Sequence, residues 1–192
     1  MYTLFISTYD KFINIALLKD DEVMEHNIKE SINSHSIYTM PMIKEILDKN
    51  NITTNDLNQI EVINGPGSFT GVRIAVTIAK TLSYTLNIPI KSISSIEALA
   101  VSSNKGKKLV TIKDLKGVYY GLFNEDNKLI EPLNYLNNKD FKEYVEKNNF
   151  ENIILEDTKL CPKKIHEYLK IQEAQNPHHV NPLYIKQIEA EK

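Results

Sequence analysis

The chain has 192 residues, 42% of them hydrophobic, and a formal net charge of -2. This composition excludes a disordered protein, and it excludes an overall basic field that would hold nucleic acid by releasing counterions. With a single cysteine, Cys161, and no apolar run approaching the roughly 18 to 20 residues that cross a bilayer, we expect a cytoplasmic protein without a membrane role.

The first half of the chain predicts a three-stranded meander followed by alternating helices and strands. Short, partly alternating apolar runs indicate strands at residues 4–7, 12–18 and 22–28. A helix is expected from Ser34, and Pro41 is expected to kink or delay it. Strands at residues 60–63 and 90–93 and helices at residues 72–86 and 94–103 complete this half.

The polar stretch NKGKK, residues 104–108, predicts a boundary, because the order of elements repeats after it. The expected elements are strands at residues 108–112, 118–123 and 128–131, a helix at 139–147, a strand at 152–155 and a helix at 163–170. Two lobes of βββαβα order are the plan of the actin-like ATPase (ASKHA) fold, whose nucleotide normally lies between the lobes. We therefore predict an α/β protein with an N-terminal lobe at residues 1–103 and a reduced C-terminal lobe at residues 104–192. A single mixed α/β domain is the alternative.

The segment NGPGSFTGVR, residues 64–73, is the densest motif and joins an apolar strand to a helix. It holds three of the six glycines and the one arginine, in a composition typical of an AT-rich genome that depletes both residue types. Ser68 or Thr70 can cap the helix, and the first helical amides with Arg73 can bind an anion. The spacing fits neither the Walker A nor the dinucleotide pattern, so a purely structural turn is the alternative. The candidate residues are Gly65, Pro66, Gly67, Ser68, Phe69, Thr70, Gly71 and Arg73.

The helix expected at residues 72–86 carries two apolar stripes rather than one. One stripe comprises Val72, Ala75, Val76, Ala79 and Leu86, and the other, nearly opposite, comprises Ile74, Ile78 and Leu82. A surface helix of a monomer shows one stripe. The second therefore predicts either cover by another element of the same chain or contact with a partner protein.

Residues 64–73 resemble, without a gap, the Gly-Pro-Gly-Ser-Phe-Thr-Gly-hydrophobic-Arg signature of the bacterial TsaB (YeaZ) family. Residues 78–100 are similar to the family's next helix and strand and to its Ser-Ser-hydrophobic-Glu-Ala-Leu segment. His35 and Ser36 match the start of a family helix, and residues 181–186 resemble its closing motif with lysine in place of arginine. The resemblance spans nearly the whole chain and weakens after residue 100.

Two departures from the family pattern concern acidic positions. Ser7 stands where members typically have an aspartate, which in active relatives serves the nucleotide and its metal. Gly117 stands where the family's Asp-Ala-Arg-x-x-Glu-Val-Tyr segment has an acidic residue. These changes, with the short second lobe, imply that nucleotide chemistry is lost. We therefore expect no catalytic residue, no cofactor and no metal.

The resemblance implies a non-catalytic scaffold subunit of the bacterial tRNA threonylcarbamoyladenosine (t6A) synthase. Such a subunit binds and activates the homologous catalytic subunit TsaD, works with the ATPase TsaE, and meets tRNA through the complex. Its helical interface also supports homodimers. The expected interface residues are His35, Ser36, Met40, Ile43, Leu47, Ile74, Ile78 and Leu82.

Two other classes of function compete with this reading. A degenerate actin-fold hydrolase or peptidase, dependent on a nucleotide or a metal, would need residues that are missing. Thr39, rather than a second histidine, follows His35 by four residues, and Cys161 lacks His or Asp company. A direct RNA-binding module would recruit the lysines of residues 104–108 and the tyrosines around Tyr119.

Overall fold

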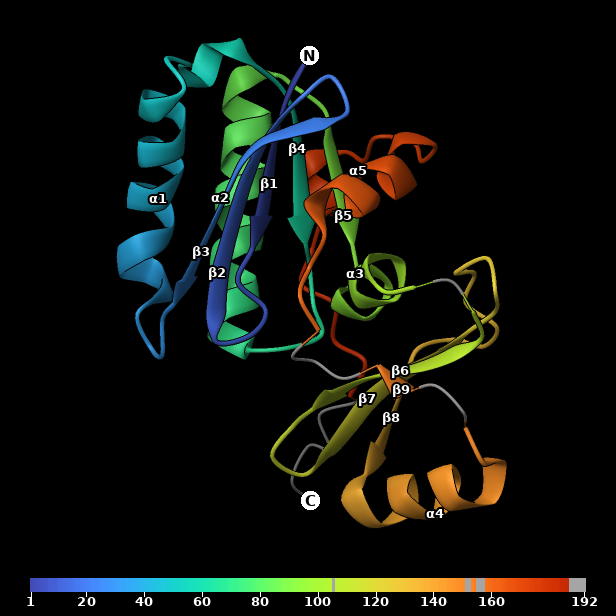
Figure 1. Cartoon of the computed structure of the whole chain (residues 1–192). Coiled ribbons are helices and arrows are strands. Elements are labelled where there is room, and N and C mark those ends of the chain that lie inside the picture. The colour runs from blue at the N-terminus through green and yellow to red at the C-terminus, as the bar shows by residue number, and fades with distance from the viewer. Residues whose placement is uncertain (105, 151–152, 155–157, 187–192) are drawn as a thin grey trace.

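Two β-sheets with their helices make up the protein (Figure 1). The structure is a computed structural model that describes residues 1–104, 106–150, 153–154 and 158–186. The first sheet has the strand order β3-β2-β1-β4-β5 and the second the order β8-β7-β6-β9. In each sheet an inner strand pairs antiparallel with the next strand of a meander and parallel with a strand that follows a helix. The second sheet thus repeats the first without its last strand, which confirms the predicted α/β actin-like fold with a reduced second lobe.

The elements of the first lobe lie close to their predicted positions. They are β1 (Tyr2–Ser7), β2 (Phe12–Lys19), β3 (Glu22–Glu30), α1 (His35–Lys49), β4 (Leu57–Ile63), α2 (Phe69–Leu86), β5 (Ile90–Ile93) and α3 (Ser95–Ser102), with a short 3-10 turn at Thr54–Asp56. Helix α1 continues through Pro41. Helix α2 begins at Phe69, earlier than predicted, because the Ser68 hydroxyl caps it by accepting the Gly71 amide at 3.2 Å.

The first sheet is covered on both faces, which explains its sequence. All but the first residue of β1, and all but the first and last residues of β2, are buried. Continuous apolar runs are what a sheet between two helical layers requires. In Figure 1, α1 and α2 cover one face of this sheet, whereas α3 and α5 lie on the other side.

The second lobe contains β6 (Lys108–Lys113), β7 (Gly117–Phe123), β8 (Asn134–Asn137), α4 (Asn138–Asn148) and β9 (Ile153–Ile154). The strand predicted at residues 128–131 is reduced to one antiparallel bridge between Phe123 and Leu129, and the regular strand β8 forms after it. The Asn124 side chain accepts the amides of Asp126 and Lys128, and Pro132 has no amide to give to a ladder. The ends of the strand predicted at residues 152–155 lie outside the described residues.

Residues 158–186, here called the C-terminal arm, return to the first lobe. The arm begins with α5 (Pro162–Lys170), which packs against α3, and Gln175 then bridges to Ile90 of β5. Further on, the Leu183 amide donates to the Asn64 carbonyl at 2.7 Å. The boundary expected at residue 104 stays a prediction; it falls between α3, which follows the last strand of the first sheet, and β6, which begins the second sheet. The arm nevertheless packs with the first sheet, so the lobe of the second sheet ends before the arm begins.

A buried polar network anchors α5 to the first sheet. His166 is 2% exposed, and its Nδ1 lies 2.7 Å from Oε1 of the fully buried Glu61 on β4. The His166 Nε2 lies 3.3 Å from Asp21 Oδ1, and Lys170 donates to the other Asp21 oxygen at 2.6 Å. The hydrogen bond to Glu61 is the main cause that raises the pKa of His166. The arm is therefore held by a histidine whose charged form is favoured.

Candidate functional site

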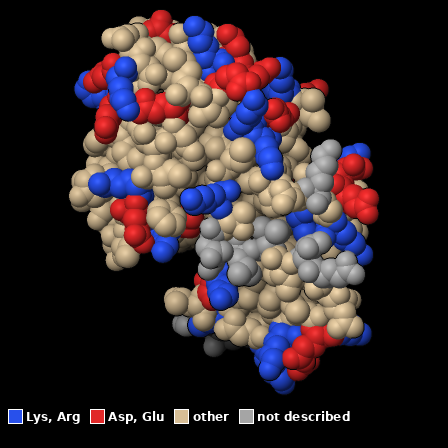
Figure 2. Space-filling view, in the orientation of Figure 1, with Lys and Arg blue, Asp and Glu red and all other residues tan. Residues whose placement is uncertain are grey.

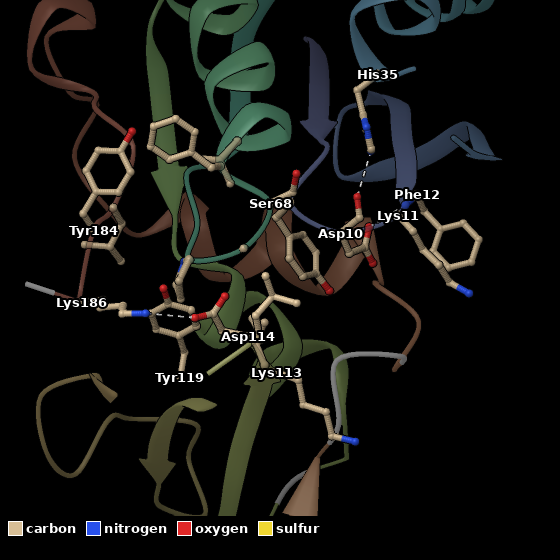
Figure 3. A pocket seen from close by; sticks show the side chains of 18 of the residues that line it. Asp10, Lys11, Phe12, His35, Ser68, Lys113, Asp114, Tyr119, Tyr184 and Lys186 are labelled. Atoms are coloured by element: carbon tan, nitrogen blue, oxygen red, sulfur yellow. Dashed lines mark hydrogen bonds and ion pairs between the residues drawn. The ribbon is translucent and has the colours of Figure 1, made fainter. Parts of the chain in front are cut away.

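A cleft of about 1000 Å³ opens between the two lobes, and Figure 2 shows the molecule notched between its larger and smaller parts. Five segments line it: the β1–β2 turn, the turn between β3 and α1 with His35, residues 64–73 (here called the glycine loop), the β6–β7 turn and the end of the arm (Figure 3). Five aromatic residues contribute to the walls, namely Tyr9, Phe12, Phe69, Tyr119 and Tyr184. This is the position at which the actin-like fold normally holds its nucleotide.

The charged groups of the cleft have partners within the chain. Lys11 Nζ lies 3.2 Å from Glu30 Oε1 and 5.1 Å above the ring of Phe12. Lys186 Nζ lies 3.4 Å from Asp114 Oδ2, and the Tyr135 hydroxyl and this carboxylate together raise the pKa of Lys186. An anion in the cleft would compete with these carboxylates for its counter-charges.

The glycine loop is packed against the β1–β2 turn, and this contact accounts for two of its glycines. The Ser68 amide donates to the Tyr9 carbonyl at 2.6 Å, and the Thr8 hydroxyl donates to the Gly71 carbonyl at 2.6 Å. A Cβ on Gly67 would lie 2.2 Å from the Tyr9 carbonyl oxygen, and one on Gly71 would lie 2.0 Å from that of Thr8. Close approach of two backbones requires glycine at both positions.

These contacts favour the structural interpretation of the loop over anion binding, which stays a prediction. The Ser68 amide is used by Tyr9 and the Gly71 amide by the Ser68 hydroxyl. Arg73, expected to supply a second contact to an anion, instead donates from Nε to the Tyr184 hydroxyl at 2.9 Å. The remaining loop residues, Gly65, Pro66, Phe69 and Thr70, complete the turn without a charge.

Ser7 and Gly117, at the two positions where the family pattern has acidic residues, lie in tightly packed surroundings. Ser7 is fully buried at the end of β1, and its hydroxyl has no hydrogen-bond partner among the residues that the structure describes. A Cβ on Gly117 would lie 2.2 Å from the Leu136 carbonyl oxygen and 2.7 Å from the Tyr135 ring. The pairing of β7 with β8 therefore excludes an acidic side chain at residue 117. In the described part of the chain, no three His, Cys, Asp or Glu side chains are placed to hold a metal ion, and no helix is long and apolar enough to span a bilayer.

The predicted interface residues of α1 divide into surface and core. Ser36 is exposed and Met40 is 46% exposed. In contrast, Ile43 and Leu47 are 1% and 4% exposed and pack in the chain's own core, and His35 is buried with its Nε2 2.9 Å from the Asp10 carbonyl oxygen. These three residues do not form surface, so any partner surface on α1 is narrower than the sequence suggested.

The second stripe of α2 is only half covered. Ile74, Ile78 and Leu82 have intermediate burial, and the last two pack against the core beside α1. Ile37, exposed on α1 between Ser36 and Met40, was not among the predicted interface residues. Its place in the turn after His35 and Ser36 was the signal that could have identified it. Helices α1 and α2 lie side by side (Figure 1), and nine of their exposed or half-buried residues are here together called the α1–α2 face: Ser36, Ile37, Met40, Thr70, Ile74, Thr77, Ile78, Thr81 and Leu82.

The outer surface of α2 is unusually neutral. Its exposed positions after the glycine loop are Arg73, Thr77, Thr81, Tyr84 and Thr85. Arg73 and Lys80 are the only charged residues in the 18-residue helix. Solvated helices normally carry charge on their outer face, whereas depletion of charge with aromatic residues present is typical of the centre of a protein interface.

A family model and several curated proteins that match this chain are named for tRNA modification. Residues 22–114 match the family model described as TsaD, tRNA N6-adenosine threonylcarbamoyltransferase. The chain is 40% identical over 134 residues to the tRNA threonylcarbamoyladenosine biosynthesis protein TsaB of Bacillus subtilis, covering 68% of the chain and 58% of that protein. It is 47% identical over 89 residues to TsaB of Buchnera aphidicola subsp. Baizongia pistaciae, covering 45% of the chain and 39% of that protein. The chain therefore spans about half the length of these curated relatives.

The solved structure of YeaZ from Pseudomonas aeruginosa superposes with a TM-score of 0.80 at 20% identity, covering 95% of this chain and 100% of that one. The likeness shows a common fold. Together with the sequence matches to several TsaB proteins, it confirms what the glycine loop indicated. The chain belongs to the TsaB (YeaZ) family.

Proposed function

We propose that this protein acts in t6A synthesis as a non-catalytic subunit that binds and activates a TsaD-type catalytic subunit through the α1–α2 face. The observation that carries the proposal is the neutral, partly apolar outer surface of α2, continued by exposed Ile37 and Met40 on α1. The assignment to t6A synthesis is taken from the names of the relatives. The catalytic subunit is suggested as the partner because the family model that matches residues 22–114 is described as TsaD. Two subunits with related lobes can pair through equivalent helices in a quasi-symmetric interface.

The cleft supports a structural rather than a chemical role. Phosphoryl transfer needs a metal held by carboxylates beside the phosphates. Ser7 and Gly117 provide no carboxylate at the two positions where the family pattern has an acidic residue. In the glycine loop, the amides of Ser68 and Gly71 already donate hydrogen bonds within the chain. Activation of the catalytic subunit would then come from the contact that the first lobe makes with it, without a chemical step in this chain.

The remaining partners enter through the assembly. A homodimer would use the same α1–α2 face and so compete with the catalytic subunit. A TsaE-type ATPase joins the larger complex, and tRNA is met through that complex, because a net charge of -2 gives this chain no basic field of its own.

Met40→Asp is expected to abolish stable pairing with the catalytic subunit while leaving the monomer folded. Met40 is 46% exposed, so the carboxylate stays hydrated in the monomer, but in the complex it would be an unpaired charge buried in an apolar surface, at a cost of about 3 to 5 kcal/mol, roughly a hundredfold or more in Kd. Isothermal titration calorimetry with the purified catalytic subunit checks the affinity, and circular dichroism checks the fold.

Tyr38→Asp is the matched control on the same helix. Tyr38 is 40% exposed, but its ring lies 4.5 Å from Lys29 Nζ of β3, away from the α1–α2 face. We expect near-normal affinity for this variant. Equal loss of affinity in both variants, or none in either, would place the partner surface elsewhere.

A further inference from the structure

The one arginine of the chain is held in an aromatic cluster at the edge of the α1–α2 face. The Arg73 guanidinium carbon lies 3.7 Å from the centre of the Phe69 ring, one turn earlier on α2, and 5.9 Å from that of Tyr184 on the C-terminal arm. The two rings are 5.9 Å apart, and the Tyr184 hydroxyl accepts the Arg73 Nε hydrogen at 2.9 Å. Contacts from two separate segments thus fix the orientation of the guanidinium.

The cluster is open to solvent although it is ordered by these contacts. Phe69 is 56% exposed, Tyr184 is 54% exposed, and Arg73 is exposed as well. Among the described residues, no carboxylate lies within ion-pair distance of Arg73. Because Nε is already used by Tyr184, the two terminal nitrogens form the fork that remains for a second planar acceptor.

We propose that the Arg73 fork receives a carboxylate side chain, Asp or Glu, of the partner protein; this inference rests on the function proposed above. Aromatic residues and arginine in a packed cluster are the usual composition of an interface hot spot. Arg73 is the residue next to Ile74 and lies one helical turn from Thr77, so the cluster is continuous with the α1–α2 face.

The charges around the cluster decide which partner fits. The other cation of α2, Lys80, donates to the His178 carbonyl and the Asn181 side chain, so no row of free cations follows the helix as an RNA backbone would require. A second copy of this chain also fits poorly. The α1–α2 face contains no carboxylate, so a symmetric dimer through this face would leave both arginines without a partner.

Arginine at this position is not replaceable by lysine in physical terms. The chain has 23 Lys and Arg residues, of which Arg73 is the one arginine. A lysine ammonium is a strongly hydrated point charge that neither stacks as a plane on Phe69 nor binds a carboxylate through two parallel hydrogen bonds.

The test is the affinity of the full chain for the purified TsaD-type catalytic subunit, measured by calorimetry at low and at high salt. Arg73→Met is expected to raise the Kd by about 30-fold or more, and Arg73→Lys by about 10-fold. The salt dependence of Kd should shrink with Arg73→Met. Lys80→Met, one change of the same kind on the same helix, should leave Kd within about twofold. Circular dichroism confirms that each variant is folded.

A Kd for Arg73→Met within about twofold of wild type would overturn the inference, and it would leave the proposed function intact if Met40→Asp still prevents binding. Failure of the wild-type chain to bind the catalytic subunit would overturn both. If Arg73→Met instead weakens tRNA binding by the assembled complex while the affinity between the subunits is unchanged, the cluster contacts phosphate, and the carboxylate assignment is wrong.

Discussion

Gly67→Val is expected to destabilise the protein by about 3 kcal/mol or more. The new Cβ would lie 2.2 Å from the Tyr9 carbonyl oxygen, and Gly67 has a φ of +157°, which a β-branched residue rarely adopts. Neither backbone can retreat easily, because the Ser68 amide is bonded to the same carbonyl. Urea unfolding followed by circular dichroism measures the change.

Ser68→Ala is the control for this variant, because it removes only the cap of α2 and should cost about 0.5 to 2 kcal/mol. Cells with Ser68→Ala as the only copy should keep near-normal t6A in their tRNA. Complete loss of t6A with a stably folded Ser68→Ala protein would make Ser68 a chemical participant and contradict a non-catalytic role.

His166→Ala is expected to cost about 3 to 5 kcal/mol at mildly acidic pH, because it leaves the buried Glu61 carboxylate without its cationic partner and with the neutral Gln59 amide, at 2.7 Å, still donating to it. The wild-type protein should also lose stability as the pH rises. The folded-state pKa of His166 is raised, chiefly by Glu61, so its contribution is fully present below the unfolded pKa and is lost as the pH rises through the folded value. Urea unfolding over a series of pH values measures this slope.

His26 provides the comparison of opposite sign. Burial lowers the pKa of His26, so this residue favours the folded state less as the pH falls. His26→Gln should therefore steepen the loss of stability with rising pH, whereas His166→Ala should flatten it. A wild-type stability that rises with pH through this range, unchanged by His166→Ala, would show that the network with Glu61 and Asp21 does not anchor the arm.

Local patterns predicted much of the fold, because most of its elements are encoded by short runs of residues. The meander is predicted by apolar runs between turns, and the start of α2 is indicated by Ser68, its cap, and by the glycine loop. The position of β8 could not be predicted in this way, because it is set by pairing with β7, which the earlier segment meets only in the bridge between Phe123 and Leu129. The return of the arm depends on contacts over about a hundred residues, such as His166 with Glu61, for which the sequence has no local signal.

The candidate site shows the same division. Spacing identifies an apolar stripe on a helix but not what covers it, so Ile43 and Leu47 of the core were predicted together with the exposed Met40. The glycines of the loop stand out in the sequence, but the reason that Gly67 and Gly71 must be glycine, close contact with the β1–β2 turn, is tertiary. The pairing of Arg73 with Tyr184 joins residues 111 positions apart and could not be inferred from either segment.

In the proposed function, this chain supports t6A synthesis by docking on the catalytic subunit through the α1–α2 face, without chemistry of its own. Threonylcarbamoyl transfer to tRNA, reconstituted from purified components and quantified by nucleoside mass spectrometry, tests it most directly. We expect modification with the catalytic subunit and wild-type chain together, and little with either alone. Met40→Asp should remain folded and fail to support the reaction. Full modification with a Met40→Asp protein that no longer pairs, or product formed by the wild-type chain without the catalytic subunit, would contradict the account.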